Sequence, residues 1–233
     1  MAYYLGGYYL IHPTPIAFGS QISKIVYTCS TCINESLLDS WSYSWTTNND
    51  RDFEQIKSAF SLTSDDIVPI RSWVDDAFDE KRIGWDCVFK DLDTLREYRQ
   101  KFFSHLHGIW IISIYFEETE ANDLLRIFKP REAHFGELGL YENLIMKIPE
   151  VESAAESLLG FDIIGMESGG GFHTFHCHDL AADLVKRFNL EVNGHGLFIA
   201  IDNTKAVSEY MNDPETGCEP VPWFVCKTKL VSD

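Results

Sequence analysis

The run from Ile109 to Phe116, with the sequence IWIISIYF, constrains the fold of this chain more than any other segment. It contains four isoleucines and three aromatic residues and no charge, a composition that favours strands and predicts one buried on both faces. A helical pattern follows over about 118–128, and Pro130 ends it because proline cannot continue a helix. The chain is therefore built around at least one deeply buried strand that leads directly into a helix.

The other predicted elements mix strands and helices without a regular alternation. Further strands are expected over 3–11, 22–28, 83–89, 161–165 and 221–230. Helices are expected over 52–60, 93–105, 179–188 and 204–212, helical stripes broken at Pro149 over 138–159, and an irregular acidic segment over 61–82. A doubly wound parallel sheet would need alternating strands and helices, so the pattern favours an α+β fold with a mixed or antiparallel sheet and packed helices. No repeat or linker interrupts the chain, which predicts one domain over 1–233, with a lobe boundary allowed near Pro149.

The charge balance is the strongest global feature. The chain has 36 Asp and Glu against 19 Lys and Arg, a formal net charge of −17. Such a charge repels nucleic acids and anionic membranes and steers association with basic proteins. The composition therefore argues against a DNA-, RNA- or lipid-binding protein. It leaves either an ordinary solvated acidic surface or an acidic face that docks a basic protein.

The N-terminal segment and the cysteines point to the cytoplasm. Residues 1–11 are apolar but lack the basic start of a signal peptide, so they read as a strand. No run of 18 apolar residues occurs that would span a membrane. Six cysteines without an export signal fit reduced intracellular thiols better than a disulfide framework. They are Cys29, Cys32, Cys87, Cys177, Cys218 and Cys226.

One short segment concentrates the side chains that bind metals or transfer protons. It follows the triplet Gly169–Gly171, whose spacing matches no phosphate-binding loop and which is predicted to form a turn. On a strand two of its histidines would share a face, and on a helix a histidine would neighbour another histidine and the cysteine. Either arrangement supplies two ligands of a zinc site. The residues are His173, His176, Cys177, His178 and Asp179.

A complete zinc site would need ligands from elsewhere in the chain. The Cys29-x2-Cys32 pair, Cys218 or Cys226 could supply them. The zinc-protease motif with a glutamate between its two histidines is absent, and so is the deaminase motif. The alternative is a polar turn before a helix, with the histidines hydrogen-bonded or exposed. No cofactor is expected on balance, and zinc is the metal that such ligands would hold.

Cys177 is also a candidate nucleophile. Adjacent imidazoles and a helix N-terminus, which Asp179 would cap, lower the pKa of a thiol. His176 and Asp179 are the other catalytic candidates, and Glu167 or Asp179 would move protons in a metal-assisted hydrolysis. Against this reading, catalytic partners usually come from distant segments, and a free cysteine is most often a small buried hydrophobe.

The C-terminal third resembles a loose group of uncharacterised bacterial proteins. The matching residues are Gly160–Gly165, Cys177, Asn193–Phe198 and Trp223–Val225. His176-Cys177-His178 stands where the group has asparagine, cysteine and glycine, and Val192 stands where the group has leucine. The group is similar in style to immunity proteins found beside bacterial toxins, by analogy alone.

Two functions remain at this point. The first is a non-catalytic acidic cytosolic binding protein, of the kind that neutralises a basic protein toxin. The second is a metal- or thiol-dependent enzyme centred on the segment His173–Asp179. Distributed acidic and aromatic residues support the first, and one local cluster supports the second.

Overall fold

A computed structural model of the chain describes most of the 233 residues. The described residues are 2–13, 15–18, 22–30, 33, 35–36, 58, 60–84, 86–128, 139–167, 171–177 and 180–232. The helix expected over 52–60 falls almost entirely outside them, and so do His178, Asp179 and Cys32.

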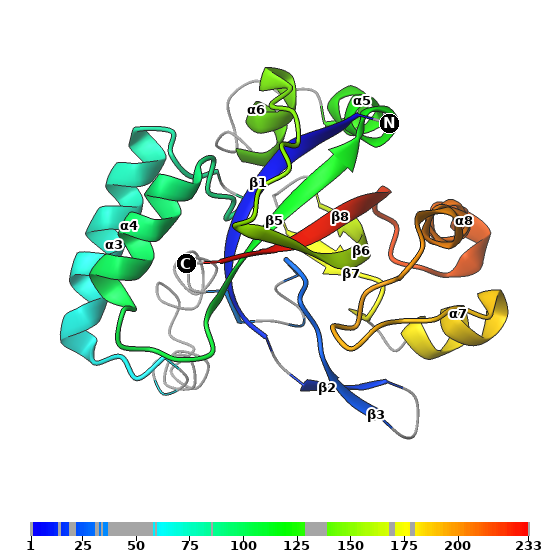
Figure 1. The fold of residues 1–233 in the computed structure, drawn as a ribbon, viewed down its shortest axis with the longest axis horizontal. Helices are drawn as coiled ribbons and strands as arrows, with labels where there is room; N and C mark the ends of the chain where they lie inside the picture. Colours follow the sequence, from blue (N-terminus) through cyan, green and yellow to red (C-terminus); the bar gives the residue numbers. More distant parts are fainter. Residues whose placement is uncertain are drawn as a thin grey trace.

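The centre of the protein is a six-stranded sheet in which each neighbouring pair is antiparallel. Its order is β4-β1-β5-β8-β6-β7, and a separate hairpin of β2 and β3 projects from one end (Figure 1). The α+β fold with an antiparallel sheet is therefore confirmed. The strands are β1 Tyr3–His12, β2 Pro15–Phe18, β3 Ile22–Ile25, β4 Glu35–Ser36, β5 Trp110–Glu117, β6 Glu156–Met166, β7 Phe172–Thr174 and β8 Trp223–Val231.

Four predicted helices are confirmed with shifts of a few residues at their ends. They are α4 Leu92–Phe102, α5 Glu118–Ile127, α7 Leu180–Phe188 and α8 Ile201–Met211. The start of α4 is capped by Asp91, whose carboxylate accepts a hydrogen bond from Thr94 N at 2.7 Å. The remaining elements are α3 Ser64–Asp79, α6 Gly139–Met146 and the short turn of 3₁₀ helix η2 Pro214–Thr216.

Helix α3 corrects one expectation. The segment 61–82, which contains Pro69, was expected to be irregular and acidic. The structure has a helix there, with an apolar stripe at helical spacing buried against the sheet and α4. The five buried residues outweigh the proline and the repulsion between acids, so tertiary packing overrides local propensity. The stripe is Ile67, Ile70, Trp73, Val74 and Ala77.

Three further segments differ from the sequence pattern. The described residues of 83–89 belong to no named strand, and Ile83 pairs with Phe89 in an isolated bridge. Residues 156–159 belong to β6 and not to a helix, so the helical part of 138–159 ends at Met146. The strand expected over 22–28 ends at Ile25.

The two faces of the sheet are covered differently. One face is apolar along its length and carries the main core, with Tyr9, Ile112 and Ile164 among its buried residues. The other face is apolar only at its two ends, where α3 and α4 cover one end and α7 and α8 cover the other (Figure 1). The middle of that second face carries polar and charged residues, which the next section describes.

Within the described residues, the chain has no helix with both the length and the apolar character needed to cross a bilayer.

Candidate functional site

The histidine–cysteine segment lies at the edge of the sheet, on β7 and the turn that follows it. β7 pairs with β6, and His173 stands opposite Gly165 in that register. His173, His176 and Cys177 are all buried, with 8%, 6% and 4% of their surface exposed. His178 and Asp179 lie outside the described residues.

The structure separates the three described members of this segment. His173 shares a face with Trp223, and its Nε2 lies 2.9 Å from Glu167 Oε1, an exposed carboxylate. His176 stacks on Phe175 at 3.9 Å between ring centroids and contacts Gly196 O through Nε2 at 2.7 Å. The two imidazoles therefore serve different neighbours, and neither contact involves Cys177.

Cys177 is held by the interior of the protein. Its Sγ accepts a hydrogen bond from Thr174 N at 3.4 Å and lies 3.6 Å from Ser30 Oγ. Ser30 Oγ in turn donates to Phe172 O at 3.0 Å. These contacts fasten the turn after β7 to residues 28–30, a packing role that a buried cysteine can fill.

Among the described residues, no three His, Cys, Asp or Glu side chains lie together as a metal-binding group. Cys29 and Cys226 are buried in the core, where burial raises the pKa of each thiol well above its ordinary value and the Asp162 charge adds to the effect. Cys218 is only partly buried, on the α7 and α8 side of the sheet. The described cysteines among the additional ligand candidates thus lie in two different cores.

Asp162 is a buried polar centre that the sequence pattern did not single out for a role. Its carboxylate accepts hydrogen bonds from Thr28 Oγ1 at 2.5 Å, Thr174 Oγ1 at 2.8 Å and Ile163 N at 2.8 Å. Burial raises its pKa from 3.8 to about 6, although these hydrogen bonds oppose the rise. An aspartate inside the apolar run of β6 was the available signal. Its contacts join β6, β7 and residues 28–30.

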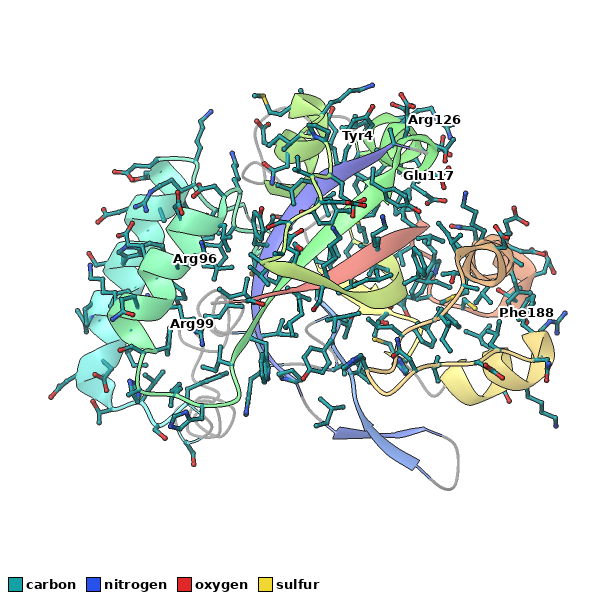
Figure 2. The ribbon with its side chains drawn as sticks, viewed as in Figure 1. Tyr4, Arg96, Arg99, Glu117, Arg126 and Phe188 are labelled. Atoms are coloured by element: carbon teal, nitrogen blue, oxygen red, sulfur yellow. The ribbon has the colours of Figure 1, made fainter. Side chains whose placement is uncertain are left out.

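A charged strip crosses the middle of the second sheet face. Its residues are Ser113 and Tyr115 on β5, Lys227 and Lys229 on β8, Glu156 on β6, and Glu150 on the segment before β6. Residues opposite each other in neighbouring strands share a face, and the register pairs Ser113 with Lys229 and Tyr115 with Lys227. Glu117, labelled in Figure 2, continues the row at the end of β5. It pairs with Lys205 of α8 at 2.5 Å.

The charges of the strip are paired in detail. Glu150 binds Lys227 at 2.6 Å through one oxygen and Lys229 at 2.5 Å through the other. Burial alone would raise the pKa of Glu150, but the hydrogen bonds and charges of the two lysines outweigh it and lower the pKa. Burial would lower the pKa of Lys229, and Glu150 and Glu156 raise it instead. Glu150 and Lys229 are thus held in their ionised forms, which suits binding and not proton transfer.

A cleft of about 600 Å³ opens above this strip, between the segment 150–154 and strands β6 and β8. The sequence could not indicate this cleft because its lining comes from two distant segments, 150–158 and 227–229, each with ordinary charged residues.

The outer surface of α3 is strongly acidic. Asp65, Asp66, Asp75, Asp76 and Asp79 are exposed, and the helix carries a single basic residue, Arg71. Val68, on the same outer side, is 71% exposed. This surface has the sign of charge and the exposed apolar side chain that a basic partner could use.

Comparison of the chain with protein-family models, with curated protein sequences and with solved structures found no match. The function must therefore be argued from the residues and their geometry.

Proposed function

We propose that the protein is a non-catalytic acidic binding protein that docks a basic protein, and specifically an immunity-type inhibitor of a basic protein toxin. The observation that carries the proposal is the outer face of α3, where five exposed aspartates accompany one arginine. Carboxylates that are exposed to water produce a negative electrostatic potential around the helix. This potential raises the rate at which a basic partner associates.

The geometry of the histidine–cysteine segment supports binding over catalysis. A nucleophilic thiol needs access to its substrate. Cys177 is only 4% exposed, and it contacts Thr174 N and Ser30 Oγ. Cys177 thus helps to hold the sheet edge together.

The test is affinity capture with a charge-reversed variant. The full chain would be immobilised beside Asp75→Lys/Asp76→Lys/Asp79→Lys, and lysate of the source organism applied at low and at high salt. We expect a protein of high isoelectric point on the wild type at low salt that is lost at high salt and on the variant, because screening weakens exposed charges. Cells that express the captured protein should be rescued by co-expression of the wild-type chain.

A matched variant separates local charge from net charge. Glu191→Lys/Glu209→Lys/Glu215→Lys makes the same change in net charge at exposed positions outside α3. It should retain most of the capture. Equal loss in both variants, or a captured protein that is acidic and insensitive to salt, would refute the proposal.

A further inference from the structure

Exposed apolar side chains gather at the end of α6 and in the segment that follows it. Ten large apolar side chains are exposed among the described residues, and four of them lie within 145–151. Single exposed apolar residues are ordinary on a protein surface, whereas a concentrated group marks a place where another molecule binds. The four are Ile145, Met146, Ile148 and Val151, which are 50%, 72%, 40% and 69% exposed.

The segment that carries these side chains is held in place by β1. Ile148 O accepts a hydrogen bond from Leu5 N at 2.9 Å, and Glu150 N donates one to Tyr3 O at 2.8 Å. The Glu150 side chain turns away from this edge and binds the two lysines of the charged strip. A surface that is ordered before its partner arrives loses little entropy on binding.

The charges at the two ends of this segment have opposite signs. Lys147 precedes the apolar residues and Glu152 follows them, and both are exposed. The Lys147 ammonium lies 5.6 Å over the ring of Tyr4, which is labelled in Figure 2. Since Glu150 is already paired with lysines, one cation and one anion remain at this surface. The surface therefore has no net charge with which to attract a basic or an acidic partner, although the chain carries −17.

Such an arrangement is complementary to itself when it is reversed. In a dimer with a two-fold axis, a residue i that contacts j of the second copy is matched by j contacting i. An axis between Pro149 and Glu150 places each Lys147 against Glu152 of the other copy. It also places Ile148 against Val151, so both charges and the apolar side chains find partners. Pro149 has no N–H with which to extend the sheet, so the contact is made by side chains.

We propose that the surface of residues 145–152 is the contact between two copies of this chain. The inference goes beyond the proposed function and does not depend on it. α6 packs on the main core face of the sheet, whereas α3 covers one end of the second face (Figure 1). A dimer formed through 145–152 therefore leaves the acidic surface of α3 exposed.

The test is sedimentation equilibrium of the full chain over a range of concentrations, with a charge exchange. The wild type should form a dimer, and Lys147→Glu and Glu152→Lys should each weaken it at least about fivefold, because each substitution changes two contacts in a two-fold dimer. The double variant Lys147→Glu/Glu152→Lys restores opposite charges and should return to within about twofold of the wild type. A chain that is monomeric at every concentration, or a double variant no tighter than the single ones, would overturn the proposal.

Matched substitutions elsewhere separate the local contact from net charge. Lys186→Glu and Glu191→Lys make the same charge changes at exposed positions on α7 and after it. Each should change the dimer dissociation constant less than about twofold. Weakening equal to that of the variants at 147 and 152 would show that no pair is formed there and overturn the proposal.

The apolar part of the contact has its own pair of variants. Met146→Ser/Val151→Ser removes two exposed apolar side chains of the surface, and Val68→Ser/Ile199→Ser removes two that are similarly exposed elsewhere. The first should weaken the dimer at least about tenfold, because apolar area that the contact buries is lost on both copies. The second should have little effect, and equal weakening by both would contradict the assignment of the surface.

Hydrogen exchange of the wild type locates the contact even if a variant does not fold. Amide exchange over 145–152 should be slower in concentrated than in dilute protein. Slowing confined to α3, or no slowing where sedimentation shows a dimer, would overturn the proposal. A dimer through 145–152 with no basic protein captured would refute the immunity-type function alone, and capture by a monomer would refute the dimer alone.

Discussion

Asp86 and Asp162 are both buried, but they accept hydrogen bonds from different kinds of donor. The kind of donor determines whether the position tolerates substitution by asparagine. Burial raises the pKa of both Asp86 and Asp162 from 3.8 to about 6. Asp162 accepts two of its three hydrogen bonds from threonine hydroxyls, which can rotate and accept in turn. Asp86 accepts hydrogen bonds from the backbone N–H groups of Gly139 and Leu140, both at 2.9 Å. A backbone N–H can only donate, so it cannot accept a hydrogen bond in turn. It thereby satisfies the start of α6.

The substitutions Asp162→Asn and Asp86→Asn should therefore differ in cost. An asparagine at 162 can donate to the hydroxyls and should change the free energy of unfolding by less than about 1 kcal/mol. At position 86 its amide would meet backbone donors, which should cost about 2–3 kcal/mol. Urea denaturation near pH 7.5 measures both. A larger loss for Asp162→Asn than for Asp86→Asn would contradict this reading of the donors.

The raised pKa of Asp162 also predicts a pH dependence. The folded state keeps the proton up to about pH 6 and the unfolded state only up to 3.8, so this residue destabilises the fold at neutral pH. The penalty shrinks as the pH falls through the folded pKa. Between about pH 7.5 and pH 5, wild-type stability should rise by on the order of 1 kcal/mol more than that of Asp162→Asn. Parallel pH profiles of the two proteins would show that Asp162 is not protonated in this range.

Burial of Cys177 predicts slow chemistry at its thiol. Native protein treated with iodoacetamide should be modified at Cys218, which is only partly buried, well before Cys177, which is 4% exposed. Peptide mapping by mass spectrometry reads both sites in one sample, and urea should make them equally reactive. Faster modification of Cys177 in the native protein would instead indicate an accessible, activated thiol.

At the scale of elements, glycines shape the strands of the sheet. The register of β6 against β8 shifts between Leu158 and Gly160, a bulge at which Gly160 has a φ of +151°. A Cβ at this position would lie 2.7 Å from Leu197 Cβ and 2.9 Å from Phe198 O. The bulge is what turns Leu158 toward the cleft and Asp162 toward the core.

Gly160→Ala should accordingly destabilise the fold by about 2–4 kcal/mol, through strain at positive φ and overlap with backbone. Gly194→Ala is the matched control, because nothing lies within 4 Å of its added Cβ. Thermal unfolding followed by circular dichroism should show a lower midpoint for the first variant and little change for the second. Equal midpoints would mean that the bulge is not under steric constraint.

Local patterns predicted strands and helices well where periodicity was uninterrupted, as in β5, α4 and α5. They failed at α3, where Pro69 and the acids concealed a stripe that only packing against β1 and α4 makes stable. Local patterns also gave the histidine–cysteine segment too much weight as the centre of a metal or catalytic site. His173 lies on β7, whereas His176 and Cys177 lie in the turn after it, and the three side chains contact different neighbours. The cleft could not be predicted from the sequence, because the residues that line it come together only when β6 and β8 pair.

At the scale of the whole molecule, charge is distributed in two ways. The net charge of −17 is carried on exposed surfaces such as α3, whereas the charged strip pairs acids and lysines nearly one to one. The unpaired charges on surfaces such as α3 act at a distance and should set the rate of encounter with a partner. The paired charges of the strip act only on contact and should set specificity. A mutation on α3 is therefore expected to alter association, and one in the cleft dissociation.

The most direct test of this account is the association rate constant of the captured partner, measured by stopped flow over a range of salt concentrations. For the wild type we expect a steep fall with rising salt, and for Asp75→Lys/Asp76→Lys/Asp79→Lys a lower and flatter dependence, because encounter is steered by the acidic surface. A rate constant that is independent of salt and the same in both proteins would contradict the central claim that this chain is an acidic protein built to dock a basic one.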